Sequence, residues 1–198
     1  MMLPVMPADR RRIRAASGQA DMRGRTYVNE QAKATYDSTL AMLKSSRHAK
    51  ITGDFGETLV LYWLSKYGFE CSRVDHTGID VIARNPHTQE LMGISVKSRS
   101  RNVGTEQSSL RISADNFEKA RVACDAFSCT PYFAIVIDVG KKIHGFLLSM
   151  EHLLTLHPMA KTSASWKMRE KSMSQYANDP EVKTFELQTA TLRWWSSK

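Results

Sequence analysis

The chain has 198 residues, of which 28 are Lys or Arg and 20 are Asp or Glu, so its formal net charge is +8. Hydrophobic residues make up 42% of the sequence, which excludes a wholly disordered chain and is enough to bury one sizeable core. No apolar run approaches the roughly 20 residues of a membrane-spanning helix, so no membrane partner is expected. Three cysteines without C-x-x-C spacing indicate neither a disulfide framework nor a zinc site, and we expect a cytoplasmic protein.

Most of the excess positive charge lies in the first 50 residues, which hold 10 basic and 4 acidic side chains. The segment before Tyr27 is polar, basic and without periodicity, which is typical of a flexible arm. Such an arm is either a nucleic-acid tether or a solvated tail. From Tyr27 to Arg47 apolar residues recur at helical spacing, so residues 1–50 are expected to form a basic N-terminal arm and helix.

The rest of the chain predicts helices and strands in alternation. In chain order, the expected elements are a helix at Gly56–Tyr67, strands at Phe69–Asp75, Ile79–Arg84 and Leu91–Ser98, a helix at Asn116–Phe127, strands at Tyr132–Asp138 and Ile143–Ser149, and a short helix at Glu151–Leu156. A polar loop is expected over Arg99–Ser109, with Ser113 or Asp115 capping the helix that follows. The unbroken apolar run YFAIVID predicts a central strand that is covered on both faces.

This order of elements predicts an α/β fold with a central mixed β-sheet flanked by helices. We expect residues 51–157 to form the core and residues 158–198 to form a C-terminal extension that packs on it. In the extension, residues 160–180 are polar with helical stretches, and Val182–Leu187 alternates like an edge strand. Trp166, Trp194 and Trp195 are interpreted as packing residues of this extension.

Three residues carry the chemistry that the sequence indicates. Glu57 falls on the arc of the first helix that also carries Val60 and Leu64, so its carboxylate lies along a face that must bury apolar groups. If the second and third strands form a hairpin, Asp80 and Lys97 can lie side by side. Two carboxylates suit a hard divalent cation, Mg²⁺ or Mn²⁺, and a lysine can stabilise charge that develops on a phosphorus centre.

The segments G56-E57-x-x-V60, G78-I79-D80-V81-I82-A83 and I94-S95-V96-K97-S98-R99 resemble the PD-(D/E)XK nuclease superfamily, which includes type II restriction enzymes and archaeal Holliday-junction resolvases. The resemblance covers about residues 50–149 and implies a restriction endonuclease-like core with the order αβββαβ. It also implies that Glu57 and Asp80 are catalytic metal ligands. Lys97 would be the catalytic lysine, and the backbone carbonyl of Val96 a further metal ligand.

The sequence departs from the family pattern at two positions. Ile79 stands in place of the proline that gives the family its name, which is common variation. Ser95 is the more serious departure, because it occupies the position of the second acid, where the family usually has Glu or Gln. A serine hydroxyl is neutral and short, so a metal site here depends on Glu57 for its second carboxylate. Ser95 is therefore expected to contribute a hydrogen bond or a water-mediated contact.

The run Lys97-Ser98-Arg99-Ser100-Arg101 places three positive charges beside the expected acidic site, and Lys97, Arg99 and Arg101 are the candidate phosphate contacts. The leading hypothesis is a Mg²⁺- or Mn²⁺-dependent endonuclease acting on duplex or branched DNA, with RNA not excluded. By analogy with the family, a homodimer would supply the two active sites needed to cut two strands.

Two other hypotheses remain open. Ser95 motivates the first, a nucleic-acid-binding module that keeps the fold without hydrolysis. The second is a structural or regulatory protein whose basic arm binds RNA.

Overall fold

The structure is a computed structural model and describes residues 44–101 and 109–189. The described residues form, in chain order, α2 (His48–Lys66), β1 (Glu70–His76), β2 (Ile79–Arg84), β3 (Leu91–Ser100), β4 (Ser109–Ser113), α3 (Ala114–Phe127), β5 (Thr130–Asp138), β6 (Lys142–Ser149), α4 (Met150–Leu156), β7 (Ser163–Lys167), α5 (Glu170–Ala177) and β8 (Lys183–Gln188). The expected order αβββαβ is therefore present, with β4 inserted before α3. Ser113 is the N-cap residue of α3, one of the two residues expected there.

A six-stranded mixed sheet in the order β1-β2-β3-β5-β6-β8 forms the centre of the fold. β1, β2 and β3 form an antiparallel meander. The chain then crosses over through α3, and β5 pairs with β3 in parallel. β6 and β8 complete the sheet in antiparallel pairings, and β8 lies at its edge as the alternation of Val182–Leu187 predicted. The α/β class and the central mixed sheet are confirmed.

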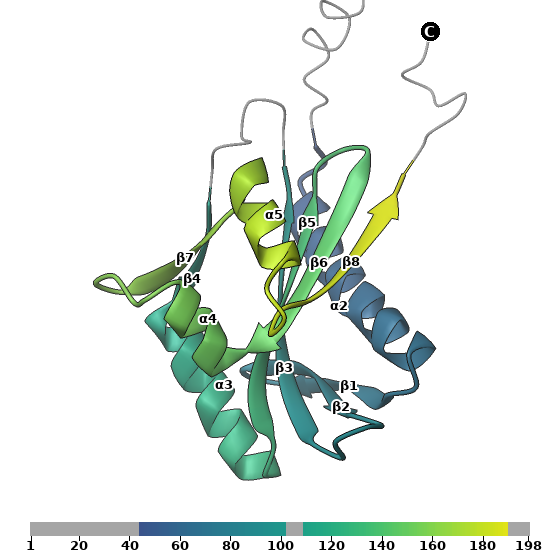
Figure 1. The fold of residues 1–198 in the computed structure, drawn as a ribbon, viewed down its shortest axis with the longest axis vertical. Helices are drawn as coiled ribbons and strands as arrows, with labels where there is room; N and C mark the ends of the chain where they lie inside the picture. Colours follow the sequence, from purple (N-terminus) through teal and green to yellow (C-terminus); the bar gives the residue numbers. More distant parts are fainter. Residues whose placement is uncertain (1–43, 102–108, 190–198) are drawn as a thin grey trace, which may run out of the picture. The chain divides into compact units, whose positions relative to one another are not determined.

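Helices cover both faces of the sheet, with α2 on one side and α3 and α4 on the other (Figure 1). Successive side chains of β5 point to opposite faces of the sheet and contact the helices on each side. Ala134 and Val136 pack with Val60 of α2, whereas Phe133 and Ile135 belong to the core cluster on the opposite side. The unbroken apolar run of β5 is thus explained by burial on both faces.

The first described helix begins earlier than expected. α2 starts at His48 and runs through Gly53 and Gly56, whereas the prediction began the helix at Gly56. Residues 44–47 are not helical, and residues 46 and 47 form a turn, so the end of the expected Tyr27–Arg47 helix is absent; the rest of that helix lies outside the described residues. Gly56 is buried, and a Cβ added there would collide with the side chain of Ser98 on β3. Glycine at this position therefore allows α2 to approach the sheet closely.

Two short strands were not predicted. β4 falls at the end of the expected polar loop, and β7 in the segment expected to be polar with helical stretches. They pair with each other in a separate two-stranded antiparallel sheet, with Ile112 opposite Ala164. Because the two strands are about 50 residues apart, no local hairpin pattern marks either of them. Their buried side chains, including Trp166, join the core on the α3 side, which confirms that Trp166 is a packing residue.

None of the helices in the described ranges is long and apolar enough to cross a membrane.

A buried histidine lies within an aromatic cluster formed by α4, β7 and α5. Tyr176 stacks on Trp166 with ring centroids 3.9 Å apart, and its hydroxyl lies 2.8 Å from Nε2 of His157. The same hydroxyl accepts a hydrogen bond from the backbone N–H of Lys167, so its own proton is available to His157. His157 can accept that proton only as a neutral imidazole. Burial lowers the pKa of His157 below 6.5, with the charge of Lys167 acting in the same direction.

The two glycines of α2 are expected to respond oppositely to alanine. Gly53→Ala should raise the free energy of unfolding by about 1 kcal/mol, because alanine is the better helix former and no atom lies within 4 Å of the added Cβ. Gly56→Ala should lower it, because the added methyl group meets Ser98. Urea denaturation measures both variants. Equal stabilisation by the two substitutions would contradict the close packing of α2 on β3.

Stability should fall as the pH drops below about 6.5, the unfolded-state pKa of histidine. Because the folded-state pKa of His157 is lowered, the unfolded state binds the proton first as the pH falls. The contribution of His157 to the free energy of unfolding is therefore fully present above pH 6.5 and is lost below it. Urea denaturation at pH 8 and pH 5.5 should therefore show a smaller difference for His157→Asn than for the wild type. His87→Asn, in the exposed β2–β3 turn, is the control and should keep the wild-type difference. A wild-type pH dependence in His157→Asn would contradict the assignment.

Candidate active site

The residues predicted from the motif come from three elements: Glu57 from α2, Asp80 from β2, and Ser95 and Lys97 from β3. β2 and β3 form the expected hairpin, with Val81 opposite Ile94 as the last registered pair before Asp80. β2 and β3 therefore bring Asp80, Ser95 and Lys97 to the region where their pairing ends, and Glu57 lies on α2, which packs on this sheet.

At this point Asp80 takes the place of a backbone partner. Its Oδ2 accepts a hydrogen bond of 2.6 Å from the backbone N–H of Val96. The neighbours of Asp80 pack on opposite sides of the sheet, since Ile79 contacts the α3 side and Val81 the α2 side. Residues two apart on a regular strand would share a face, so the strand is rotated at Asp80. The carboxylate consequently lies between the two strands.

The backbone of Val96 faces the same gap. In an extended strand the N–H and C=O of one residue point to the same edge, as the reciprocal bonds of an antiparallel pair require. Because the N–H of Val96 meets Asp80, its carbonyl oxygen is also directed toward that edge. The carboxylate of Asp80 and the carbonyl of Val96 are therefore two oxygen donors on one side of β3.

Ser95 and Lys97 form a polar pair on β3. Nζ of Lys97 donates a hydrogen bond of 2.8 Å to Oγ of Ser95, whose residue is only 1% exposed. Burial lowers the pKa of the Lys97 ammonium, and the negative charges of Asp80 and Glu57 act in the opposite direction. Both carboxylates thus act electrostatically on a lysine that is partly removed from water, the environment in which such a charge interacts most strongly.

Glu57 is bound by an arginine that sequence reasoning did not identify. Nη2 of Arg73, on β1, donates a hydrogen bond of 2.5 Å to Oε2 of Glu57 and lies 3.9 Å from Asp54. The side chain of Arg73 is 50% exposed and that of Glu57 is 22% exposed. Arg73 lies opposite Val81 in the β1–β2 pairing, next to the position of Asp80. This register is not apparent from the sequence, so Arg73 could not be linked to the site in advance.

The oxygen donors at this site suit a hard divalent cation. Two carboxylates, Glu57 and Asp80, and the carbonyl of Val96 would hold it, and oxygen ligands are those that Mg²⁺ and Mn²⁺ prefer. No group of three or more His, Cys, Asp or Glu side chains in the described part of the chain could hold a metal ion. With Ser95 in place of a third acid, water or substrate oxygens would have to complete the coordination.

The three candidate phosphate contacts have different surroundings. Lys97 is half-buried at the site, and Arg99 is exposed two residues later on β3. Arg101 is instead drawn inward, and its Nη1 donates to the carbonyl of Met168 at 3.1 Å. Lys44, which the sequence assigned only to the basic arm, donates to the carbonyl and hydroxyl of Ser100 at 2.9 Å.

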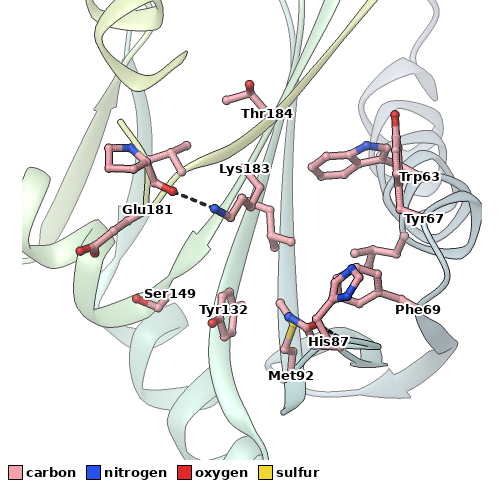
Figure 2. Close-up of a pocket in the computed structure, with 15 residues that line it drawn as sticks. Trp63, Tyr67, Phe69, His87, Met92, Tyr132, Ser149, Glu181, Lys183 and Thr184 are labelled. Atoms are coloured by element: carbon pink, nitrogen blue, oxygen red, sulfur yellow. Dashed lines mark hydrogen bonds between the residues drawn. The ribbon is translucent and has the colours of Figure 1, made fainter. Parts of the chain in front are cut away.

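A separate groove of about 740 Å³ lies between α2 and the segment that leads into β8. Figure 2 shows Trp63 and Tyr67 on one side and Lys183 and Thr184 on the other. Two polar side chains of the groove have partners within the protein: Lys183 donates to the carbonyl of Pro180 at 2.8 Å, and Tyr132 to Glu90 at 3.1 Å. None of the residues predicted from the motif lines it, so the groove is no part of the candidate active site.

A scan against protein-family models finds no family that matches the chain, and a search of curated proteins finds no match either. Among solved structures, the chain is similar to a Holliday junction resolvase of the archaeal hyperthermophile Archaeoglobus fulgidus. The TM-score is 0.45 and the sequence identity is 19%, over 62% of this chain and 88% of the resolvase chain. The assignment of the site residues therefore depends on the sequence motif and on the contacts within this chain.

Arg73→Gln should tighten the binding of Mn²⁺ by about two- to fivefold, the size of an exposed ion pair. The reason is that Arg73 occupies an oxygen of Glu57 and adds a positive charge beside the donors that would hold the cation. Isothermal titration calorimetry with Mn²⁺ measures the effect. Arg84→Gln, on the β2–β3 hairpin, provides a control with the same loss of charge. Unchanged affinity in Arg73→Gln would mean that arginine and cation do not compete for Glu57.

Proposed function

We propose that the protein is a metal-dependent nuclease that hydrolyses phosphodiester bonds in DNA. The observation that carries this proposal is the position of Asp80, whose carboxylate accepts a hydrogen bond from the β3 backbone at Val96, one residue before the half-buried Lys97. The negative charge of Glu57 also acts on this lysine and raises its pKa against the effect of burial. The resemblance to the PD-(D/E)XK superfamily implies a metal-binding aspartate, a backbone carbonyl and a catalytic lysine, and Asp80, Val96 and Lys97 are the residues at these positions.

Each residue has a role that its contacts support. Glu57, Asp80 and the carbonyl of Val96 would hold Mg²⁺ or Mn²⁺, which supplies charge stabilisation at phosphorus and lowers the pKa of water. Lys97 is a compact cation in a partly desolvated position, suited to orient the attacking water or to stabilise charge on the phosphate oxygens. Ser95 holds Nζ of Lys97 through its hydroxyl. Arg99, exposed on the same strand, would contact the phosphate backbone of DNA.

A second function is favoured by a specific set of contacts. Ser95 brings no charge, and Glu57 and Lys97 both have partners within the protein, Arg73 and Ser95. A site closed in this way suits a module of the same fold that binds nucleic acid without cutting it. The two functions differ in a single measurable property, cleavage in the presence of a divalent cation.

Cleavage of supercoiled plasmid and of branched DNA with Mg²⁺ or Mn²⁺ tests the proposal. Asp80→Asn and Lys97→Met should each reduce the rate at least about 100-fold, the usual cost of removing a group that acts on the transition state. Asp125→Asn on α3 and Lys66→Met at the end of α2 make the same chemical changes at exposed positions and should leave the rate unchanged.

Two results would contradict the nuclease assignment. The first is equal cleavage by the wild type and the Asp80→Asn and Lys97→Met variants, which would mean that the activity comes from elsewhere. The second is DNA binding that weakens with salt but is not accompanied by cleavage, which would identify the non-hydrolytic module.

A further inference from the structure

The C-terminal end of α3 brings two cysteine side chains together. Ser128 follows the helix in the left-handed region, with a φ of 51°. The backbone N–H of Ser128 donates to the carbonyl of Asp125 at 3.3 Å, and that of Cys129 donates to the carbonyl of Cys124 at 2.9 Å. These two hydrogen bonds form the Schellman motif, in which the residues joined by the longer bond are often in side-chain contact. Here both of these residues are cysteines.

Gly93 of β3 provides the space that both sulfur atoms occupy. The position that a Cβ on Gly93 would take lies 2.5 Å from Sγ of Cys124 and 2.6 Å from Sγ of Cys129. Because both sulfurs lie so close to one point, they are neighbours of each other. Any side chain at position 93 would have to displace them, so glycine allows the pair to pack against the sheet. Both cysteines are free thiols in the structure.

The two thiols differ in their access to solvent. Cys124 is 1% exposed and packs with Ile79 and Ala123, whereas Cys129 is partly exposed and packs against the same cluster. Sγ of Cys124 lies 3.7 Å from the carbonyl oxygen of Gly93, to which it donates a weak hydrogen bond. A reagent in solution therefore reaches Cys129 before it reaches Cys124.

Cys124 is also protected chemically. Burial raises its pKa to about 12, and the hydrogen bond and charge of Cys129 act in the same direction. At neutral pH Cys124 is therefore a protonated thiol, which does not react with reagents in solution. Its sulfur is placed to react only with a group that is already in contact with it, and the sulfur of Cys129 is such a group.

We propose that Cys124 and Cys129 are a site of reversible oxidation, at which an intramolecular disulfide closes the end of α3. The modification goes beyond the proposed nuclease function, because it needs neither a metal nor any residue of the candidate active site. If the two cysteines served only as the apolar contact of the helix end, their sulfurs would stay unbonded in the presence of an oxidant.

The oxidant is a low-molecular-weight disulfide such as glutathione disulfide. The thiolate of Cys129 attacks one of its sulfurs, so that a mixed disulfide forms and one glutathione thiolate leaves. This thiolate takes up the proton of Cys124, whose sulfur then attacks Sγ of Cys129 and expels the second glutathione. The second glutathione recovers the proton that Cys129 had released to water. In total the protein gives up two electrons and two protons, and glutathione disulfide becomes two molecules of glutathione.

Oxidation of the full-length protein with glutathione disulfide, followed by alkylation under denaturing conditions, tests the site. Trypsin yields one peptide, residues 122–141, that carries Cys124 and Cys129 without Cys71. In mass spectrometry this peptide should lack both alkyl groups and be two hydrogens lighter than its reduced form. Dithiothreitol should restore both alkylated thiols. A wild-type peptide that stays fully alkylated, or that retains glutathione on Cys129, would overturn the proposal.

Two variants separate the steps of the reaction. In Cys124→Ala the reaction should stop at the mixed disulfide, so that the peptide carries one glutathione on Cys129. In Cys129→Ser the buried Cys124 should take up no glutathione. Cys71→Ser is the control and should form the same disulfide as the wild type. The measurement on the wild type needs no substitution, so it decides the proposal even if a variant does not fold.

Asp80→Asn should form the disulfide to the same extent as the wild type, because Asp80 takes no part in the reaction. The same variant should lose cleavage of DNA. Failure of the nuclease proposal and failure of this site are therefore separate results.

Discussion

The parallel pairing of β3 with β5 is the constraint on which the rest of the structure depends. The two strands are in register from Met92 opposite Thr130 to Ser100 opposite Asp138. A parallel pair needs a crossover, which α3 supplies, and it is stable only when both faces are covered. α2 covers one face, and α3 with α4 covers the other (Figure 1). Fixing β3 in this way also fixes Ser95 and Lys97, which lie in the middle of the registered pairs.

The candidate active site arises where this order is broken. β2 and β3 are paired in regular register from Arg84 back to Val81. At Asp80 the strand is rotated, and the Asp80 carboxylate, rather than a backbone carbonyl, accepts the hydrogen bond from the N–H of Val96. The break leaves a carboxylate and a backbone carbonyl at the edge of a strand that is otherwise fully paired. A sheet that continued through Asp80 would have consumed these polar groups in its own hydrogen bonds.

Two cations, one on β3 and one directly after it, illustrate how burial and partners decide what a charge can do. Lys97 is partly buried, and desolvation lowers its pKa in spite of the opposing charges of Asp80 and Glu57. Arg101 is directed inward with one edge of its guanidinium unpartnered among the described residues, and its positive charge is felt by His144. The sequence presents Lys97, Arg99 and Arg101 as one basic run. In the fold Lys97 lies near two carboxylates, Arg99 is exposed, and Arg101 is turned toward the carbonyl of Met168.

The sequence by itself determined the order αβββαβ of the core without β4, the hairpin of β2 and β3, the central strand β5 and the edge strand β8, because each depends on local periodicity or on a turn. It did not predict the start of α2, since Gly53 and Gly56 are poor helix formers and the close approach of Gly56 to Ser98 is a tertiary contact. It missed β4 and β7 because their pairing joins distant segments. It named Glu57, Asp80, Ser95 and Lys97 from their motif. Only the tertiary structure decided that Arg73 binds Glu57 and that Arg101 binds the carbonyl of Met168, because burial and charge pairing depend on which segments become neighbours.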